Sequence, residues 1–245
     1  MPRKLGQHFL IAESILERLA VAACGKHAAR VVEIGPGRGA LTRHLLTRTD
    51  ELHAVELDAA LAEQLCVQFA SDPRVHIHRA DVLETDLGAW GPAVIAGNLP
   101  YYITSPIIDR FLALPAAFGA AVFLVQWEVA ERLRAKPHSR DYGFLSVKTQ
   151  LQCQVELVVK VPPGAFAPPP KVDSAAVKLI RKPGPPPSPR LIEFIGRCFA
   201  HKRKTLRNNL RPFYSRAALE AMPEMDLRAE QIAVEEFACL WERLE

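Results

Sequence analysis

The chain has 245 residues, of which 49% are hydrophobic and 24% are charged, a composition that is typical of a globular protein and excludes the disordered and fibrous classes. Lys and Arg number 31 against 27 Asp and Glu, and this net charge of +4 neither requires nor excludes a nucleic-acid partner. The five cysteines form no CxxC pair, so we expect no disulfide framework, no bound metal and a reducing, cytoplasmic location.

The N-terminal segment lacks the features of a targeting peptide. Arg3, Lys4 and Glu13 interrupt the first 16 residues, which contain no long apolar core. The longest uncharged run, residues 111–127, is broken by Pro115 and Gly119. We therefore expect no signal peptide, no membrane span and no membrane partner.

Short β-branched runs alternate with helix-compatible sequence in the first half of the chain. The strands are predicted at residues 30–34, 51–56, 75–78, 93–96 and 121–125. Such alternation predicts an α/β fold with a mostly parallel sheet and helices on both faces. Sheets of this kind bind ligands in the crevice outside the carboxyl ends of their strands, so residues that follow the strands are the first site candidates.

The first predicted strand runs into a glycine-rich turn. Gly35, Gly37 and Gly39 precede a helix that is predicted to begin near Leu41. Glycines let the backbone pass close to a ligand in conformations that a Cβ would forbid. The turn also fits the dinucleotide pattern G-x-G-x-x-A, which ends here at Ala40. It therefore predicts a nucleotide-like cofactor, either NAD or S-adenosylmethionine.

Acidic residues follow the next two strands. Glu56 lies 21 residues after Gly35, where a carboxylate can accept hydrogen bonds from both hydroxyl groups of a ribose. Asp81 follows the third strand and could accept from the exocyclic amine of a bound adenine. Taken alone, Asp81 could equally cap a helix. Together with the glycine turn, the two acids favour a cofactor site.

The segment Asn98, Leu99, Pro100, Tyr101 follows the fourth strand. An exocyclic adenine amine is a weak nucleophile because its lone pair is delocalised into the ring. The Asn98 side-chain oxygen and a backbone carbonyl released by Pro100 could accept the two amine hydrogens, while Tyr101 stacks on a flipped base. Asn98 would orient the amine rather than act as a base. The alternative is a strand-end Asx turn with a packing tyrosine.

The uneven distribution of prolines indicates a boundary between two domains. Ten of the 20 prolines lie between Pro162 and Pro189, and residues 183–190 are predicted to form a stiff linker. We expect one domain over residues 1–182 and a small helical domain over residues 191–245. Apolar spacing predicts a helix over residues 191–199, and residues 219–244 are compatible with two short helices.

These motifs, taken together, resemble those of the ribosomal RNA adenine N6-dimethyltransferase family, and most closely its bacterial 16S branch, the kasugamycin-sensitivity type. The resemblance covers nearly the whole chain. Its eight segments in order are GQHFL at residues 6–10, VEIGPG at 32–37, VELD at 55–58, NLPY at 98–101, residues 126–133, DYG at 141–143, the Pro-rich stretch at 161–174 and HKRKTLRNNL at 201–210. It implies a class I methyltransferase domain that uses S-adenosylmethionine, followed by a small helical domain.

The resemblance also implies a substrate. This is two adjacent adenosines in the hairpin loop near the 3′ end of 16S rRNA, each converted to N6,N6-dimethyladenosine during small-subunit assembly. We therefore expect 16S rRNA in an assembling 30S subunit as the partner and a monomeric enzyme. A site that stops at one methyl group would have nearly the same sequence, because only the room around the nitrogen would differ.

Motif positions assign roles to individual residues. The resemblance assigns the cofactor to His8, Leu10, Gly35, Gly37, Glu56, Asp81 and Asn98. It assigns catalysis to Asn98, Leu99, Pro100, Tyr101 and Phe166, with Phe166 as a second aromatic wall opposite Tyr101. The alternative for Phe166 is a core position. Three residues depart from the common family pattern, namely His8, Tyr102 and Trp127, and we expect Trp127 to pack in the core.

Charge in the C-terminal region is strongly polarised. Residues 190–216 hold eight basic residues and one acid, whereas residues 217–245 hold two basic residues and eight acids. Because phosphate contacts dominate the affinity for folded RNA, we predict RNA contacts from Arg132, Arg134, Lys136, Arg140, Lys171, Lys202, Arg203, Lys204 and Arg207. The alternative is a solvated helix face or pairing with the acidic tail.

Three other functions compete with this reading. A 23S rRNA adenine N6-methyltransferase of the macrolide-resistance type shares the cofactor and NLPY motifs, although the Pro-rich loop and HKRKTLRNNL favour 16S. A ribosome-assembly factor could use the same fold without catalysis, but Glu56, Asp81 and Asn98 are intact. An NAD-dependent oxidoreductase would need a proton-transfer residue beside the nicotinamide, and the NLPY segment contains none.

Overall fold

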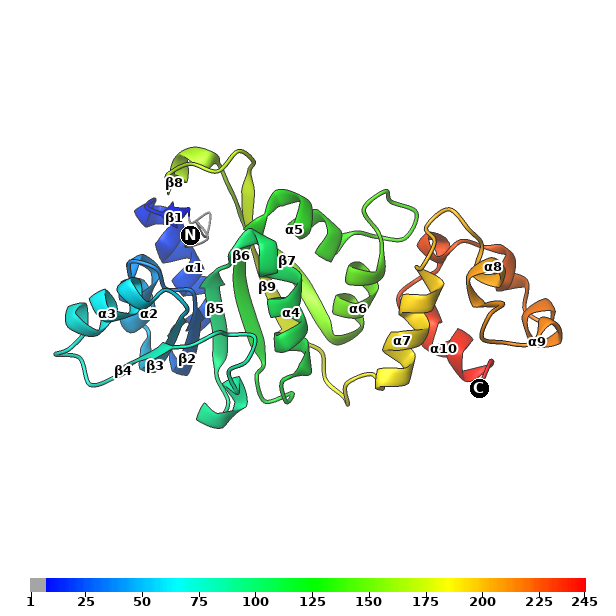
Figure 1. Ribbon diagram of the computed structural model, residues 1–245, viewed down its shortest axis with the longest axis horizontal. Coiled ribbons are helices and arrows are strands. Elements are labelled where there is room, and N and C mark those ends of the chain that lie inside the picture. The colour runs from blue at the N-terminus through cyan, green and yellow to red at the C-terminus, as the bar shows by residue number, and fades with distance from the viewer. Residues whose placement is uncertain (1–7) are drawn as a thin grey trace. The chain divides into compact units, whose positions relative to one another are not determined.

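The computed structural model describes residues 8–245 (Figure 1). Gly6 and Gln7 of the predicted N-terminal motif lie outside the described residues, as do Arg3 and Lys4. The chain divides into two compact units. The first comprises residues up to Ala130 together with Val155–Arg181, and the second comprises Glu131–Gln154 and Lys182–Glu245. The second unit thus includes residues 131–154, which the sequence assigned to the first domain.

The first unit is built on a seven-stranded sheet in the order β4-β3-β2-β5-β6-β9-β7. Its strands are β2 (Ala28–Ile34), β3 (Thr49–Glu56), β4 (Val75–Arg79), β5 (Val94–Asn98), β6 (Ala120–Gln126), β7 (Cys153–Val161) and β9 (Ser174–Arg181). The strands from β2 to β6 pair in parallel, and β9 runs antiparallel to β6. All five predicted strands are confirmed to within two residues, and β7 and β9 are additional.

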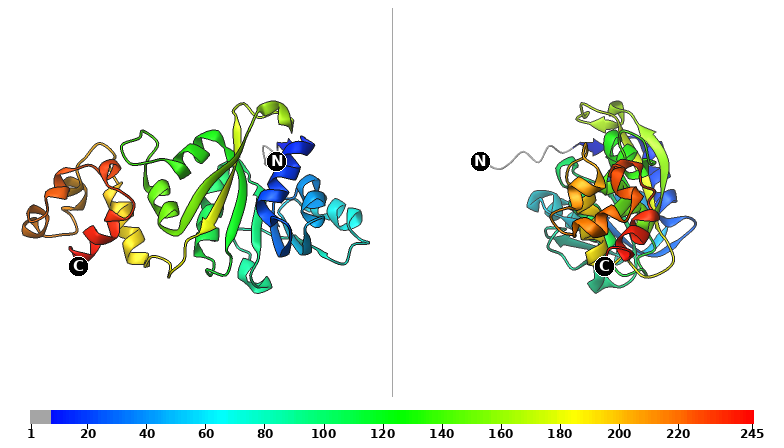
Figure 2. Two further views of the ribbon diagram at one scale, coloured as in Figure 1. Left: turned by 180° about the vertical axis from the view of Figure 1, so that it is seen from behind. Right: turned by 90° about the vertical axis from the view of Figure 1, so that its right-hand side faces the viewer.

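Helices cover both faces of this sheet, as predicted (Figures 1 and 2). The helical elements are α1 (Glu13–Cys24), α2 (Ala40–Leu46), α3 (Ala59–Gln68), α4 (Thr104–Ala113) and α5 (Trp127–Arg134), with 3-10 turns η1 (Leu87–Trp90) and η2 (Tyr101–Ile103). On one face, Leu19 of α1 and Leu45 of α2 share a buried cluster with Leu124. On the other face, the Phe111 ring of α4 meets Phe123 edge-on at 6.2 Å. Among residues 8–245, no helix is both long and apolar enough to cross a membrane.

The strands β2 to β5 end at one edge of the sheet. Ile34 pairs with Val55 and Glu56 pairs with Arg79, so the residues that follow these strands converge. Gly97 lets β5 approach β2 closely, because a Cβ at this position would overlap the carbonyl oxygen of Ile34. The edge therefore gathers polar residues from four strands.

A two-stranded sheet ties the N-terminal arm to the Pro-rich loop. β1 (Phe9–Leu10) pairs antiparallel with β8 (Phe166–Ala167), which places Leu10 opposite Phe166. The 3-10 turn η3 (Pro163–Ala165) precedes β8, and the Ile11 N–H donates to the Ala165 carbonyl oxygen at 2.8 Å. These contacts fix the arm at a position that sequence periodicity does not predict.

The second unit is helical (Figure 2, green for residues 131–154 and yellow to red for residues 182–245). It contains α6 (Phe144–Gln152), α7 (Pro189–Cys198), α8 (Leu206–Leu210), α9 (Arg216–Glu220) and α10 (Glu236–Glu242), with 3-10 turns η4 (Pro223–Asp226) and η5 (Ala229–Gln231). Its core brings Tyr142 and Val147 together with Phe194 and Phe237. The Tyr142 hydroxyl donates to the carbonyl oxygen of Ile232 at 2.9 Å. Residues 131–154 belong to this unit because their apolar side chains complete its core.

The helix α7 begins inside the predicted linker. Ser188 accepts a hydrogen bond from the Leu191 N–H at 3.1 Å, and Pro189 occupies the first turn, where its missing N–H costs nothing. The helix predicted over residues 191–199 is thus confirmed with an earlier start. Within residues 219–244, α10 is the one full helix that forms, and 3-10 turns replace the other.

Candidate active site

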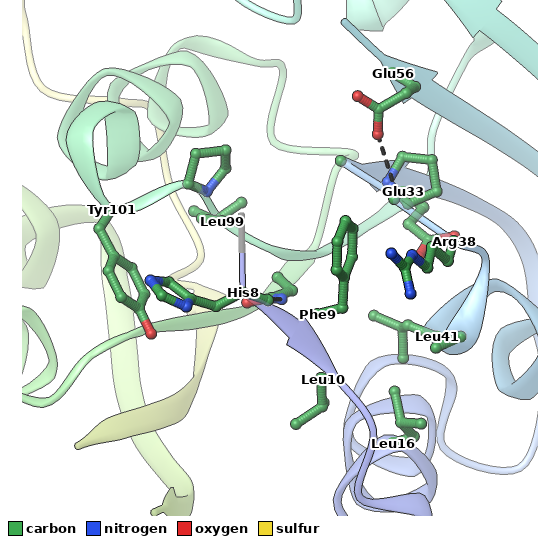
Figure 3. Close-up of a pocket in the computed structure, with 16 residues that line it drawn as sticks. His8, Phe9, Leu10, Leu16, Glu33, Arg38, Leu41, Glu56, Leu99 and Tyr101 are labelled. Carbon is green, nitrogen blue, oxygen red and sulfur yellow. Dashed lines mark hydrogen bonds between the residues drawn. The ribbon is translucent and has the colours of Figure 1, made fainter. Parts of the chain in front are cut away.

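Two adjoining pockets open at the carboxyl edge of the sheet. The larger encloses about 810 Å³, counting its open mouth, and is lined by the N-terminal arm, the glycine turn and the NLPY segment (Figure 3). The smaller encloses about 480 Å³ and is lined by Asp81 and Tyr102, among others. Gly35, Glu56 and Pro100 line both. An elongated ligand of nucleoside size can therefore extend through the two pockets.

The glycine turn forms one wall of the larger pocket. Gly35, Gly37 and Gly39 have φ angles of 65°, 58° and 75°, in the left-handed region that side chains disfavour. A Cβ at Gly37 would also lie 3.0 Å from the Phe9 ring. The Arg38 guanidinium lies 4.5 Å from the centroid of that ring. The turn therefore presents its backbone to the pocket, as the sequence predicted.

Glu56 is a buried carboxylate at the boundary between the pockets. Its side chain accepts hydrogen bonds from the Gly37 N–H at 3.0 Å and the Asp58 N–H at 2.9 Å, one at each oxygen (Figure 3 shows the first). The residue is 5% exposed. Each carboxylate oxygen retains acceptor capacity after one bond. Glu56 is therefore oriented by the backbone and still able to bind hydroxyl groups.

Asp81 caps a turn and also lines the smaller pocket. Its Oδ1 accepts the Leu83 N–H at 2.8 Å, and its backbone oxygen accepts the N–H of Thr85 at 2.9 Å, so it caps a turn. Its Oδ2 makes no hydrogen bond within residues 8–245. The capping bond thus fixes a carboxylate that lines the smaller pocket with a free acceptor.

Asn98 ends β5 at the larger pocket. Its Nδ2 donates to the His8 carbonyl oxygen at 2.9 Å, which leaves Oδ1 as an acceptor. The next residue, Leu99, donates its N–H to the Leu124 oxygen at 3.0 Å. Its own carbonyl precedes Pro100 and has no hydrogen-bond donor within the described residues. Two acceptors, the Asn98 side chain and the Leu99 carbonyl, therefore follow one another on the chain.

Tyr101 is held by contacts with Ser174 and His8. Its hydroxyl lies 2.7 Å from the hydroxyl oxygen of Ser174, a fully buried residue. Burial raises the pKa of Tyr101, so the phenol is neutral at physiological pH. The His8 ring stacks on Tyr101 at a centroid distance of 5.9 Å (Figure 3), and His8 Nδ1 lies 2.8 Å from the Pro168 oxygen. The aromatic pair thus links the arm, the NLPY segment and the Pro-rich loop.

Glu33 is a pocket residue that sequence reasoning missed. It is 1% exposed, lines the larger pocket and accepts a hydrogen bond from the Thr42 hydroxyl at 2.6 Å. Burial raises its pKa to about 8, and the neighbouring Glu56 adds to the shift. An acid inside an otherwise apolar buried strand, two residues before the glycine turn, is the signal that could have identified it.

Phe166, predicted as an aromatic wall opposite Tyr101, does not line either of the two pockets described. It is 3% exposed and packs in the same buried cluster as Leu10, its partner in the β1–β8 pair. Strand pairing turns this side chain into the core, which is the alternative stated for it. Leu10 belongs to the same cluster and also lines the larger pocket.

Tyr102 and Trp127, which depart from the common family pattern, have different surroundings. Tyr102 lines the smaller pocket and is 61% exposed. Trp127, predicted to pack in the core, is only half-buried. The Lys160 ammonium lies 4.7 Å from its ring centroid, and Lys160 also pairs with Asp173 at 2.7 Å. Trp127 therefore forms a cation–π contact rather than an all-apolar one.

Most of the predicted RNA-contacting residues lie in the second unit. Arg132, Arg134, Lys136, Arg140, Lys202, Arg203 and Lys204 are exposed there, and Lys171 is exposed in the first unit. The Lys202 ammonium donates to the backbone oxygen of Arg140, so basic runs 62 residues apart in sequence meet. Arg207 pairs with Asp226 at 2.6 Å, which is the intramolecular alternative.

Comparisons with known proteins agree on one family. The family model described as "Ribosomal RNA adenine dimethylase" matches residues 1–245. Relatives named "Ribosomal RNA small subunit methyltransferase A" include that of Acidobacterium capsulatum, 42% identical over 99% of this chain and 90% of its own. That of Pseudomonas fluorescens strain Pf-5 is 40% identical over 99% and 93%.

Solved structures are similar over almost the whole chain. A dimethyladenosine transferase from Plasmodium falciparum matches with a TM-score of 0.80 at 26% identity, covering 95% of this chain and 96% of that one. The 23S rRNA methyltransferase ErmE matches with a TM-score of 0.72 at 30% identity, covering 96% and 99%.

Proposed function

Since this chain belongs to the ribosomal RNA adenine dimethylase family and has its class I methyltransferase fold, we propose that it dimethylates N6 of two adjacent adenosines in 16S rRNA. The adenosines lie in the hairpin loop near the 3′ end, and S-adenosylmethionine is the methyl donor. The proposed partner is an assembling 30S subunit, and the proposed working form is a monomer. The observation that carries this proposal is the convergence of Glu56, Asp81 and Asn98 on two adjoining pockets.

The chemistry of the smaller pocket fits the adenosine part of S-adenosylmethionine. Glu56, oriented by two backbone N–H groups, would accept the ribose hydroxyls. The free Oδ2 of Asp81 would accept the adenine amine. Both residues line this pocket, and Glu56 also reaches the larger one.

The larger pocket fits the methionine part. Gly35 and Gly37 leave the turn without side chains, and His8 and Leu10 supply the opposite wall from the arm. Glu56 adds a carboxylate to this lining, which suits a positively charged sulfur. When bound there, S-adenosylmethionine supplies an electrophilic methyl group.

Asn98 and Leu99 prepare the target nitrogen. The Asn98 Oδ1 and the Leu99 carbonyl oxygen would accept the two hydrogens of the adenine amine and direct its lone pair toward the donor. The bond from Asn98 Nδ2 to the His8 oxygen keeps Oδ1 turned to the pocket. The amine becomes strongly acidic once methylated, so its proton leaves without a dedicated base.

Tyr101 would stack on the flipped adenine, with its hydroxyl anchored by Ser174.

The second methylation requires additional space in the pocket. After the first transfer the nitrogen keeps one hydrogen, so one of its two acceptors loses its partner. The pocket must therefore admit a methyl group beside either Asn98 or Leu99.

The exposed basic residues of the second unit form the proposed RNA surface. We define it by Arg132, Arg134, Lys136, Arg140, Lys202, Arg203 and Lys204. The contact between Lys202 and Arg140 makes it continuous. Such a surface binds phosphates without reading sequence, so the target would be selected by RNA shape. Lys171 would add a contact from the Pro-rich loop.

Labelling of ribosomal particles tests the proposal. Purified protein with tritiated S-adenosylmethionine should label 30S particles that lack this modification, and digestion should place the label in N6,N6-dimethyladenosine of the 3′-end hairpin. Asn98→Ala should abolish labelling, because the amine loses one acceptor, while RNA binding and the melting temperature stay near wild type.

Three other outcomes of the labelling experiment would each contradict a different part of the proposal. Label in 50S particles would overturn the 16S assignment in favour of a 23S methyltransferase. Tight RNA binding without label in either particle would favour an assembly factor. Full labelling by Asn98→Ala would remove Asn98 from the mechanism and leave the substrate assignment intact.

A further inference from the structure

A cluster of three histidines and a glutamate lies on β3 and β4, away from the residues assigned to methyl transfer. Glu51 and His53 come from β3, and His76 and His78 come from β4, the edge strand of the sheet. Ligand atoms of Glu51, His53 and His76 all lie within 4.8 Å of one another. These residue types are the usual nitrogen and oxygen ligands of zinc.

Strand register brings these side chains to one face. His53 pairs with His76, and residues two apart on a strand share a face, so Glu51 joins His53 on β3 and His78 joins His76 on β4. Their face is opposite that of Leu52 and Ala54, which pack in the core cluster beneath α1 and α2. The cluster is therefore a consequence of parallel pairing and not of a local loop.

The distances approach those of a metal centre. Glu51 Oε1 lies 3.0 Å from His53 Nε2 and 3.7 Å from His76 Nε2. Tetrahedral ligands with zinc bonds of about 2.0–2.1 Å stand roughly 3.3 Å apart. The His53 side chain is 8% exposed and that of His76 is 44% exposed. The His53 and His76 rings stack at a centroid distance of 4.8 Å, so the exposed His76 would turn to bring its Nε2 to the metal, and water would take the fourth position.

Further residues hold the ligands in place. Arg30 binds the other Glu51 oxygen, Oε2, at 2.6 Å, which leaves Oε1 for the cluster. His53 Nδ1 lies 3.0 Å from His78 Nε2, so His53 can donate its Nδ1–H there while Nε2 binds a metal. The Trp90 ring stacks on His53 at 4.6 Å and an interplanar angle of 9°. In protein metal sites, contacts of this kind around the ligands set the tautomer and orientation of each imidazole.

We propose that Glu51, His53 and His76 bind one divalent transition-metal ion of the zinc type, which clamps the edge strand β4 to β3. The pattern E-x-H on one strand and H-x-H on the next is the sequence signal for it. The sequence-based expectation of no metal rested on cysteine spacing and did not consider alternation across paired strands. The ion has a structural role, because the site is separate from Asn98 and the NLPY segment.

Metal binding by the full chain tests this site. After chelator treatment, the protein should bind one Zn²⁺ by calorimetry and metal analysis, and Zn²⁺ should raise its melting temperature. His76→Ala removes an exposed ligand, so the chain should fold normally, bind Zn²⁺ at least tenfold more weakly and lose the thermal shift. Co²⁺ in place of Zn²⁺ should give the strong visible absorption of a four-coordinate site in the wild type alone.

Matched variants separate this site from incidental binding. His27 is an exposed histidine paired with Asp50 at 2.9 Å but with no second imidazole beside it in the described residues, so His27→Ala should bind Zn²⁺ as the wild type does. Glu51→Gln, nearly isosteric, should weaken binding as His76→Ala does. Equal Zn²⁺ affinity in the wild type and His76→Ala, or no bound Zn²⁺ in the wild type, would overturn the proposal.

Discussion

At the scale of single residues, Tyr101 depends on a partner outside the pocket. Ser174 meets its hydroxyl at 2.7 Å, is fully buried and lines neither of the two pockets. Ser174 begins β9, the strand that runs antiparallel to β6. It is thus a positioning residue for Tyr101, supplied by a strand that lies more than 70 residues further along the chain.

Removing either hydroxyl should have the same effect. We expect Tyr101→Phe and Ser174→Ala each to lower kcat for RNA methylation about three- to tenfold, because each removes one hydrogen bond worth about 1 kcal/mol. The double variant should lose no more than either single variant, since the bond is shared. Steady-state kinetics with an unchanged KM for S-adenosylmethionine would check this, and multiplicative losses would show that Ser174 acts by another route.

Glu33 makes stability depend on pH. Burial raises its pKa from 4.5 to about 8, so in the folded state it stays protonated across a range in which the unfolded chain ionises. A group whose folded pKa is raised contributes stability below pH 4.5 that is lost as the pH rises toward 8. The loss is up to about 1.4 kcal/mol per pH unit in this range.

The variant Glu33→Gln isolates this contribution. Glutamine can still accept the Thr42 hydroxyl through Oε1, but it does not ionise. Urea unfolding at pH 5, 6, 7 and 8 should show wild-type stability falling relative to the variant as the pH rises. Parallel curves for the two proteins would mean that Glu33 is ionised in the fold.

At the scale of elements, sequence periodicity identified the strands that position the site. Val31, Val32 and Ile34 are apolar because both faces of a parallel strand are covered, and the polar residues after such strands must then meet at one edge. This reasoning was sufficient to place Glu56, Asp81 and Asn98 beside the pockets at that edge. It was insufficient for Phe166, because the two-residue pair of β1 and β8 exists only through tertiary contact and has no period.

The basic segment before α8 is an element whose charge is available to RNA. Lys202, Arg203 and Lys204 are exposed, whereas Arg207 is paired with Asp226. We expect Lys202/Arg203/Lys204→Ala to weaken rRNA binding and to reduce the slope of log affinity against log salt by about 2 to 3, because each lost phosphate contact removes nearly one released counterion.

A paired arginine supplies the control for this element. Arg216 lies in the same basic stretch but pairs with Glu220 at 2.7 Å, so Arg216→Ala should leave the salt slope unchanged. Binding titrations at several salt concentrations measure both variants. An unchanged slope in the triple variant would assign the RNA surface elsewhere, while cofactor affinity should stay constant in both.

At the scale of the whole molecule, the chain crosses between its two units more often than the sequence indicated. The prolines of residues 183–190 mark one crossing, and their composition made it visible. The crossings near residues 130 and 155 fall within α5 and β7, and no change of composition marks them. Only the long-range packing of residues 131–154 with α7 and α10 reveals them, and such contacts have no local signature.

This arrangement predicts how the chain responds to truncation. A chain ending at Lys182 would keep the predicted first domain complete, yet it would lose the partners of Tyr142 and Val147, both fully buried in the second unit. Exposing these side chains costs roughly 1.5–3 kcal/mol each, and the Tyr142 hydroxyl would lose the Ile232 oxygen. We therefore expect the truncated chain to melt at a lower temperature than the full chain and to bind a hydrophobic dye.

The point variant Tyr142→Phe is the control for the truncation. It removes the hydroxyl alone and should lower the free energy of unfolding by only about 1 kcal/mol. If the truncated chain melts cooperatively at the full-length temperature without binding dye, residues 131–154 fold with the first unit. In that case a single boundary at the Pro-rich linker is correct.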